Sequence, residues 1–167
     1  MDYKYLQFNN IWGLYNLISD LKHPHPDFLQ QQYSKFHQHY FETLSLLKEI
    51  GFIYEEKKLI NIFSKYTSQS SKGKISSVMD FRNTLIDSCL KSDKYSLQIN
   101  ELFDKCQAVN GKLMFELNFS EKMQYSDVRN FYISLGLIEY NPDSRNYYIN
   151  PQYNSVVNKN MNGIHRK

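Results

Sequence analysis

The chain has 167 residues, of which 41% are hydrophobic and 16% aromatic, and its formal net charge is +3. This length suits one ordinary domain or two small domains that share a core, and the aromatic content argues against wholesale disorder. No run of consecutive apolar residues is long enough for a transmembrane helix. The first residues, MDYKYLQFNN, lack the charged-then-apolar order of a signal peptide, so a cytoplasmic protein is expected.

The positive charge lies outside the two regions predicted to fold. Seven lysines balance seven acidic residues over 1–66, and residues 78–150 hold eight basic and ten acidic groups. The excess comes from a polar linker and from the C-terminal end, through Lys72, Lys74, Lys159, Arg166 and Lys167. Because nucleic-acid binders usually concentrate lysine and arginine on one folded surface, this distribution argues against nucleic-acid binding.

The first half of the chain predicts three helices and a hairpin. Apolar residues at helical spacing predict an amphipathic helix over about 9–22. The prolines of HPHP (23–26) end it, and Pro26 suits the first turn of a short helix through DFLQQQY. A third helix from about His39 ends at Gly51, and FIYEEKKLINI (52–62) predicts a β-hairpin.

A connecting region and a second set of elements follow. An additional helix is expected between the halves, on the spacing of Val78, Phe81, Leu85, Ile86, Cys89 and Leu90. SLQINELFDKCQAV predicts a helix capped by Ser96, GKLMFELN a strand, and FSEKM a short helix started by Ser120. YSDVRNFYISL predicts the third helix, ending at Gly136, and LIEYNPDSRNYYIN a hairpin with the turn Asn141–Ser144. The cysteines Cys89 and Cys106 do not form a CxxC motif; Cys106, on the apolar face of its predicted helix, is expected to be a reduced core thiol.

The two halves align with each other at an offset of 85 residues. One register holds from residue 14 to residue 53 and pairs Leu14 with Ile99, Leu47 with Tyr132, Gly51 with Gly136, and Ile53 with Ile138. A single register held over that length predicts a duplicated module.

Helix, strand, short helix, helix and hairpin is the order of a winged helix-turn-helix. FETLSLLKEIGFIYEEKKLINI and YSDVRNFYISLGLIEYNPDSRNYYIN carry this pattern, and the chain resembles a tandem winged helix-turn-helix protein over about 9–150. The resemblance implies a mostly helical α+β fold with two winged-helix modules joined by a connecting helix. The expected organisation is module 1 at 1–66, linker and connecting helix at 67–94, module 2 at 95–153, and a flexible basic tail at 154–167. In the first copy, HPHPDFLQ stands where a strand is expected.

The stretch HPHPDFLQQQYSKFHQHY (23–40) holds four of the five histidines and has three interpretations. A metal site needs converging ligands, yet His37 and His39 would point some 200° apart on a helix and only Asp27 lies nearby, so no metal is expected. The histidines instead line a hydrogen-bonded turn, or they begin a recognition helix that contacts DNA. The residues of the second alternative are Lys35, His37, Gln38 and His39.

The second copy offers further candidate DNA contacts. Arg129 and Asn130 lie off the apolar face of their helix, and these residue types read guanine and adenine edges in the major groove. Lys122, Gln124 and Ser126 flank them and are candidate phosphate contacts, while Arg145 in the hairpin is a candidate for the minor groove. A solvated polar face would look the same, and Asp127 and Asp143 would repel phosphates.

The sequence predicts a binding protein, not an enzyme, and no cofactor. Phosphate-binding glycine loops, HExxH, GxSxG and paired-carboxylate motifs are absent from the sequence. Duplex DNA binding is the favoured function, as a regulator or as the recognition module of a prokaryotic defence-type protein. The alternative is a platform for protein partners, favoured by the neutral-to-acidic bodies and the abundant aromatic residues.

Overall fold

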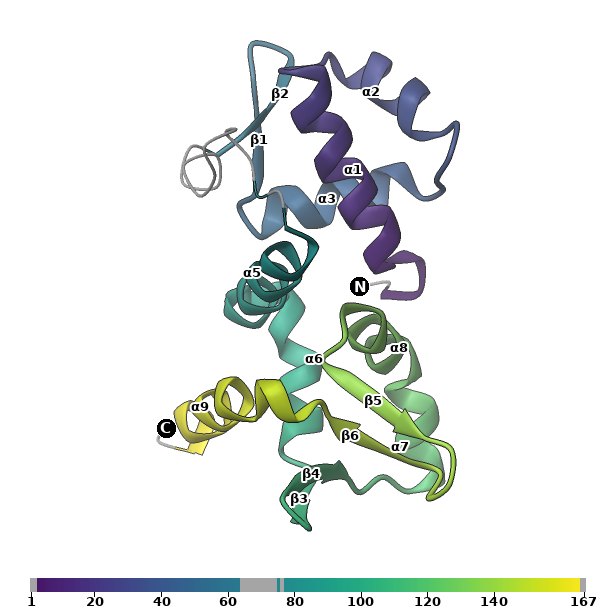
Figure 1. Cartoon of the computed structure of the whole chain (residues 1–167), viewed down its shortest axis with the longest axis vertical. Coiled ribbons are helices and arrows are strands. Elements are labelled where there is room, and N and C mark those ends of the chain that lie inside the picture. Colours follow the sequence, from purple (N-terminus) through teal and green to yellow (C-terminus); the bar gives the residue numbers. More distant parts are fainter. Residues whose placement is uncertain (1–2, 64–74, 76, 166–167) are drawn as a thin grey trace. The chain divides into compact units, whose positions relative to one another are not determined.

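The structure of the chain, a computed structural model, describes residues 3–63, 75 and 77–165. Its architecture is α+β and mainly helical, as expected from the sequence, with two small antiparallel sheets in the described ranges. The chain divides into two compact units (Figure 1). The N-terminal unit is Tyr5–Ser88, and the C-terminal unit combines Met1–Lys4 with Cys89–Lys167.

The N-terminal unit contains the helices and the hairpin predicted for the first half. These elements are α1 (Phe8–Leu21), α2 (Pro26–Tyr33), α3 (Tyr40–Glu49), β1 (Ile53–Glu56) and β2 (Leu59–Ile62). β1 and β2 pair antiparallel, and α1 packs against α2, α3 and β2 through its buried apolar face. The predicted additional helix is α5 (Val78–Lys91), whose Phe81 packs against Trp12 and Tyr15 in this core. The polar linker at 64–74 lies outside the described residues.

The proline-rich stretch ends α1 and starts α2, as predicted. Pro26 is the first residue of α2, and the ring of His25 accepts a hydrogen bond of 3.3 Å from the backbone N–H of Asp27. His25 is therefore the N-cap of the helix, where an acceptor is needed because the first N–H groups have no partner in the helix.

The C-terminal unit begins with a short segment from the start of the chain. Tyr3 is 2% exposed, its ring lies 5.5 Å from that of Phe131, and its hydroxyl donates to the backbone carbonyl of Tyr95. The Tyr132 hydroxyl donates to the same carbonyl at 2.9 Å. Burial raises the pKa of both phenols well above the ordinary value, so both remain neutral hydrogen-bond donors.

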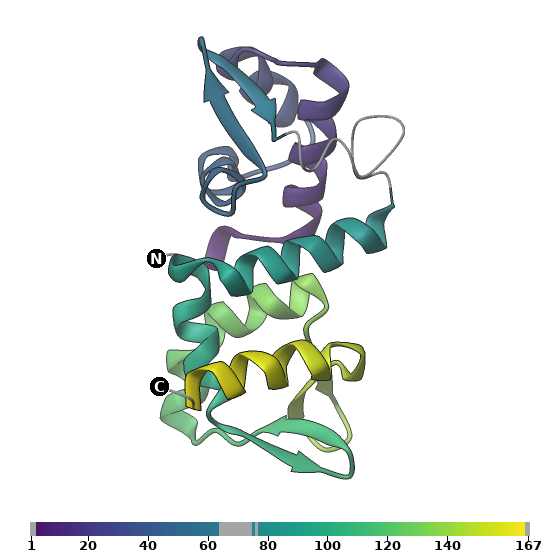
Figure 2. The same ribbon diagram turned by 90° about the vertical axis from the view of Figure 1, so that its left-hand side faces the viewer.

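The rest of the C-terminal unit alternates helices and strands. In chain order these are α6 (Asp93–Phe103), β3 (Cys106–Val109), β4 (Lys112–Phe115), α7 (Phe119–Gln124), α8 (Ser126–Leu135), β5 (Ile138–Asn141), β6 (Asn146–Ile149) and α9 (Asn154–His165). The strands form one antiparallel sheet in the order β3-β4-β6-β5. α8 packs on α6, α7 and β5, and α9 lies beside α6 (Figure 2).

The two units end their third helices through hydrogen bonds spaced 85 residues apart. The N–H of Phe52 donates to the carbonyl of Leu47, and the N–H of Leu137 donates to that of Tyr132, both at 3.0 Å. The residue before each donor is a glycine with positive φ, 80° at Gly51 and 88° at Gly136, which is the left-handed conformation that this helix ending requires. The hairpins then begin at Ile53 and Ile138, which are also 85 residues apart.

The two units differ at the position of the first strand, where the sequence of the first copy has HPHPDFLQ. In the C-terminal unit β4 pairs with β6, whereas in the N-terminal unit the carbonyl of Pro24 accepts a single hydrogen bond of 2.9 Å from the N–H of Ile60. A proline cannot donate to a β-ladder, which limits this segment to an accepting contact.

Several local predictions for the second half were wrong. α6 is capped by Ser92 instead of Ser96, and α7 by Asn118 instead of Ser120. Cys106 lies in strand β3 and not on a helix, because Asn110 and Gly111 both take positive φ and turn the chain into the β3–β4 hairpin. Both cysteines are free thiols. Residues 154–165 of the predicted flexible tail form helix α9, with Val157 fully buried, and the 3-10 turn Pro151–Tyr153 precedes them.

Candidate nucleic-acid interface

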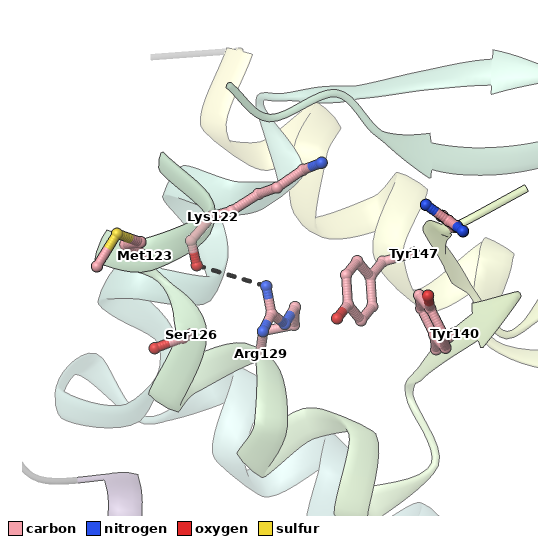
Figure 3. A pocket seen from close by; sticks show the side chains of 7 residues that line it. Lys122, Met123, Ser126, Arg129, Tyr140 and Tyr147 are labelled. Atoms are coloured by element: carbon pink, nitrogen blue, oxygen red, sulfur yellow. Dashed lines mark hydrogen bonds between the residues drawn. The ribbon is translucent and has the colours of Figure 1, made fainter. Parts of the chain in front are cut away.

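An open pocket of about 410 Å³ lies between the α7–α8 helices and the β5–β6 hairpin (Figure 3). It brings together four of the residues selected from the sequence: Lys122, Ser126, Arg129 and Arg145. The other lining residues are Met123, Tyr140 and Tyr147, which the sequence analysis did not select. Tyr140 and Tyr147 are paired across the two strands of the hairpin. Period-two alternation along the predicted strands could have placed both on the same face of the hairpin.

The helices that form one wall are fixed by caps and buried residues. Asn118 and Glu121 form a reciprocal capping box at the start of α7, with hydrogen bonds of 2.9 and 3.0 Å. At the junction with α8, the Tyr125 hydroxyl donates to Glu101 on α6 at 2.9 Å. The inner face of α8 is fully buried, through Val128, Phe131, Tyr132 and Leu135. Arg129 lies beside this face and points toward the hairpin, whereas the hydroxyl group of Ser126 points away from it (Figure 3).

Arg129 is the most constrained cation of the pocket. Its guanidinium carbon lies 4.3 Å from the centre of the Tyr147 ring, and its Nη1 donates to the backbone carbonyl of Lys122 at 3.4 Å. Its Nε is buried without a hydrogen-bond partner among the described residues. The cation–π contact therefore holds a guanidinium that still has donor capacity.

The hairpin turn places Arg145 at the opposite wall. The side chain of Asn141 accepts hydrogen bonds from the N–H groups of Asp143 and Ser144, and the backbone carbonyl of Asn141 accepts one of 2.8 Å from the N–H of Arg145. Arg145 takes the left-handed conformation, with φ of 58°. This position usually selects glycine, asparagine or aspartate, so an arginine here carries a conformational cost.

Electrostatically, the described lining is cationic. Lys122, Arg129 and Arg145 line the pocket, and its lining contains no aspartate or glutamate. Glu121, one residue from Lys122, forms an ion pair with Lys105, and the hydrogen bond from Lys105 lowers the pKa of its carboxyl group. Asp127 and Asp143 lie near in sequence and are exposed, but they are not among the residues that line the pocket. The pocket is therefore suited to an anion.

The remaining candidates of this unit do not line the pocket. Gln124 is exposed at the last position of α7, and Asn130 is exposed on α8. Both amides are open to solvent beside the pocket walls.

The candidates of the N-terminal unit do not gather into a comparable site. Lys35 and Gln38 are exposed, and Lys35 donates to the side chain of Gln32 at 3.0 Å. His37 hydrogen-bonds Asn10 at 3.1 Å and stacks on Tyr33, with ring centres 5.1 Å apart. His39 stacks on Tyr5 at 4.5 Å.

The ring of His37 also explains a glycine inside α1. A Cβ atom added at Gly13 would lie 2.4 Å from Nε2 of His37, which is closer than van der Waals contact allows. His37 therefore packs against the backbone of α1. Of the four clustered histidines, His37 and His39 are thus involved in helix packing.

The other two clustered histidines also have local partners. His23 hydrogen-bonds the side chain of Asn61, and His25 caps α2. Within residues 3–63, 75 and 77–165, no three His, Cys, Asp or Glu side chains come together in an arrangement that could hold a metal ion.

Comparisons with known proteins do not place the chain. No protein-family model matches it, and no curated protein or solved structure matches it. In the part of the chain that the structure describes, no helix has the length and apolar character needed to cross a membrane.

Proposed function

We propose that the C-terminal unit binds duplex DNA as a winged helix. Its elements follow the order α6, β3, β4, α7, α8, β5, β6, with the strands arranged β3-β4-β6-β5. Apart from the additional strand β3, this order matches that of a winged helix-turn-helix, which supports the proposal; α8 would be the recognition helix and β5–β6 the wing. The observation that carries the proposal is the convergence of Lys122, Arg129 and Arg145 on one pocket between that helix and that wing.

The proposed DNA contacts differ according to how freely each side chain can move. Lys122 and Arg145 stand on opposite walls and would contact phosphates, while Arg129, held against Tyr147, would contribute a fixed charge between them. Arg129 was predicted from the sequence to read a base, but its contacts with Tyr147 and Lys122 favour a phosphate role. The exposed amides of Asn130 and Gln124 remain candidates for base edges.

The N-terminal unit would be a second winged-helix module in this proposal. Its α1, α2, α3 and β1–β2 follow the same order, and the carbonyl of Pro24 stands in for the first strand. The chain would then act in the cytoplasm, as a regulator or as the recognition module of a prokaryotic defence-type protein.

A second candidate function, a platform for protein partners, is favoured by exposed aromatic residues. In the N-terminal unit Phe28, Phe36 and Phe41 are 48%, 84% and 65% exposed. Large aromatic side chains are enriched at the centres of protein interfaces. The N-terminal unit fits this function better than the C-terminal unit, since its histidine and lysine candidates form no cationic pocket.

The salt dependence of binding to a mixed-sequence duplex tests the proposal. Three phosphate contacts predict that affinity falls roughly 40-fold between about 50 and 200 mM salt. Fluorescence anisotropy of a labelled duplex measures this directly. Absence of binding at low salt would contradict the proposal and favour the protein platform.

A further inference from the structure

The lining of the pocket includes side chains that phosphate contacts do not require. Phosphates on the surface of a duplex are bound by cations and by hydrogen-bond donors, yet the walls of this pocket also present the apolar surfaces of Met123, Tyr140 and Tyr147. Tyr140 is 47% exposed and Met123 is 65% exposed. Their apolar surfaces remain in contact with water although they lie at the edge of a concave site.

These walls are suited to the face of a nucleobase. Bases stack on aromatic rings and on arginine guanidinium groups, and proteins that hold unpaired nucleotides combine such rings with cations for the backbone. Tyr140 and Tyr147 lie with ring centres 4.9 Å apart, and Arg129 covers Tyr147. Tyr140 is therefore the ring that is most available for stacking.

The volume agrees with one nucleotide. About 410 Å³ lies within the range of roughly 300–1,000 Å³ that is usual for small-molecule sites. The pocket is open on one side, so a nucleotide that remains joined to a DNA strand can enter.

We propose that this pocket takes one unpaired nucleotide of a DNA duplex, such as a single-nucleotide overhang, with its base against Tyr140 and Met123 and its phosphate at Lys122 and Arg145. This inference rests on the proposed DNA binding and adds to it a preference for an unpaired end.

Two duplexes of the same sequence test the inference, one blunt and one with a single unpaired 2-aminopurine nucleotide at one end. We expect the overhang duplex to bind about fivefold more tightly or better, with quenching of 2-aminopurine fluorescence by stacking. Tyr140→Ala should abolish both the preference and the quenching, whereas Tyr140→Phe, which keeps the ring, should retain them.

The outcomes separate this inference from the proposed function. Equal affinity for both duplexes without quenching would overturn the inference and leave duplex binding in place. Binding to neither duplex would overturn both. Met123→Ala provides a second variant at an exposed position, and it should reduce the preference without loss of thermal stability.

Discussion

The guanidinium carbon of Arg129 lies 4.3 Å from the centre of the Tyr147 ring, and this contact joins helix α8 to strand β6. It connects the two walls of the pocket through their side chains. An arginine held in this way loses less conformational entropy when it binds an anion.

A double-mutant cycle tests whether Arg129 and Tyr147 act together. We expect Arg129→Ala and Tyr147→Leu each to weaken duplex binding, and the double variant to lose less than the sum. Cation–π contacts contribute about 0.5–2 kcal/mol, so a coupling free energy of about 1 kcal/mol is expected. Additive losses, measured by anisotropy on the same duplex, would show that Tyr147 does not position Arg129.

Replacement of Arg145 by glycine separates DNA binding from folding. Arg145→Gly removes the cation and suits the left-handed backbone, where the relief of strain offsets the entropy cost of glycine. The free energy of unfolding should therefore change by less than about 1 kcal/mol. The slope of log affinity against log salt should become shallower by about 0.9.

Lys122→Ala should change the salt slope by the same amount, and it should weaken binding to all duplex sequences equally. Lys94→Ala is the matched control, because Lys94 is an exposed lysine on α6 that does not line the pocket. If the control variant lost as much affinity as Lys122→Ala, binding would not be located at the pocket.

The packing of His37 on Gly13 predicts that the effect of Gly13→Ala on the free energy of unfolding changes sign when His37 is replaced by alanine. Gly13→Ala in the natural chain should destabilise the N-terminal unit by about 1–3 kcal/mol, because the new Cβ would clash with the imidazole. In a His37→Ala background the same change should stabilise it by about 0.5–1 kcal/mol, which is the ordinary gain of alanine over glycine inside a helix. Chemical unfolding of the four proteins measures both values, and destabilisation in both backgrounds would contradict this packing.

Alkaline pH should destabilise the protein through its buried phenols and thiols. Burial raises the pKa of Tyr40 from 10.0 to about 12 and that of Cys106 from 9.0 to about 12. A raised folded-state pKa gives stability that is complete below the unfolded value and is lost as pH rises through the folded value. The loss from Tyr40 should fall between pH 10 and about 12, and Tyr40→Phe should reduce it. Thermal melts across this range measure the effect; a Tyr40→Phe variant with the natural pH profile would contradict it.

Periodicity and turn chemistry were enough to predict most elements. The glycine helix endings and the hairpin at Asn141–Ser144 follow from short-range rules. The sequence predicts a helix in place of β3, because apolar residues continue at helical spacing from Leu102 to Cys106. The turn residues Asn110 and Gly111 favour a hairpin instead.

The site was predicted in part, for a physical reason. Lys122, Ser126, Arg129 and Arg145 were selected on residue type and helix face, and the structure brings them into one pocket. The roles of His37 and His39 depend on contacts with Gly13, Tyr33 and Tyr5. Packing of this kind between helices is not determined by local spacing.

Backbone chemical shifts during titration with a short duplex test the central claim most directly. DNA binding at the pocket predicts that the largest changes in the amide signals fall in Lys122–Asn130 and Tyr140–Tyr147, the two walls of the site. The signals of α1 and α9 should change little. Changes concentrated on other elements, or no changes at low salt, would contradict the assignment of this surface to DNA.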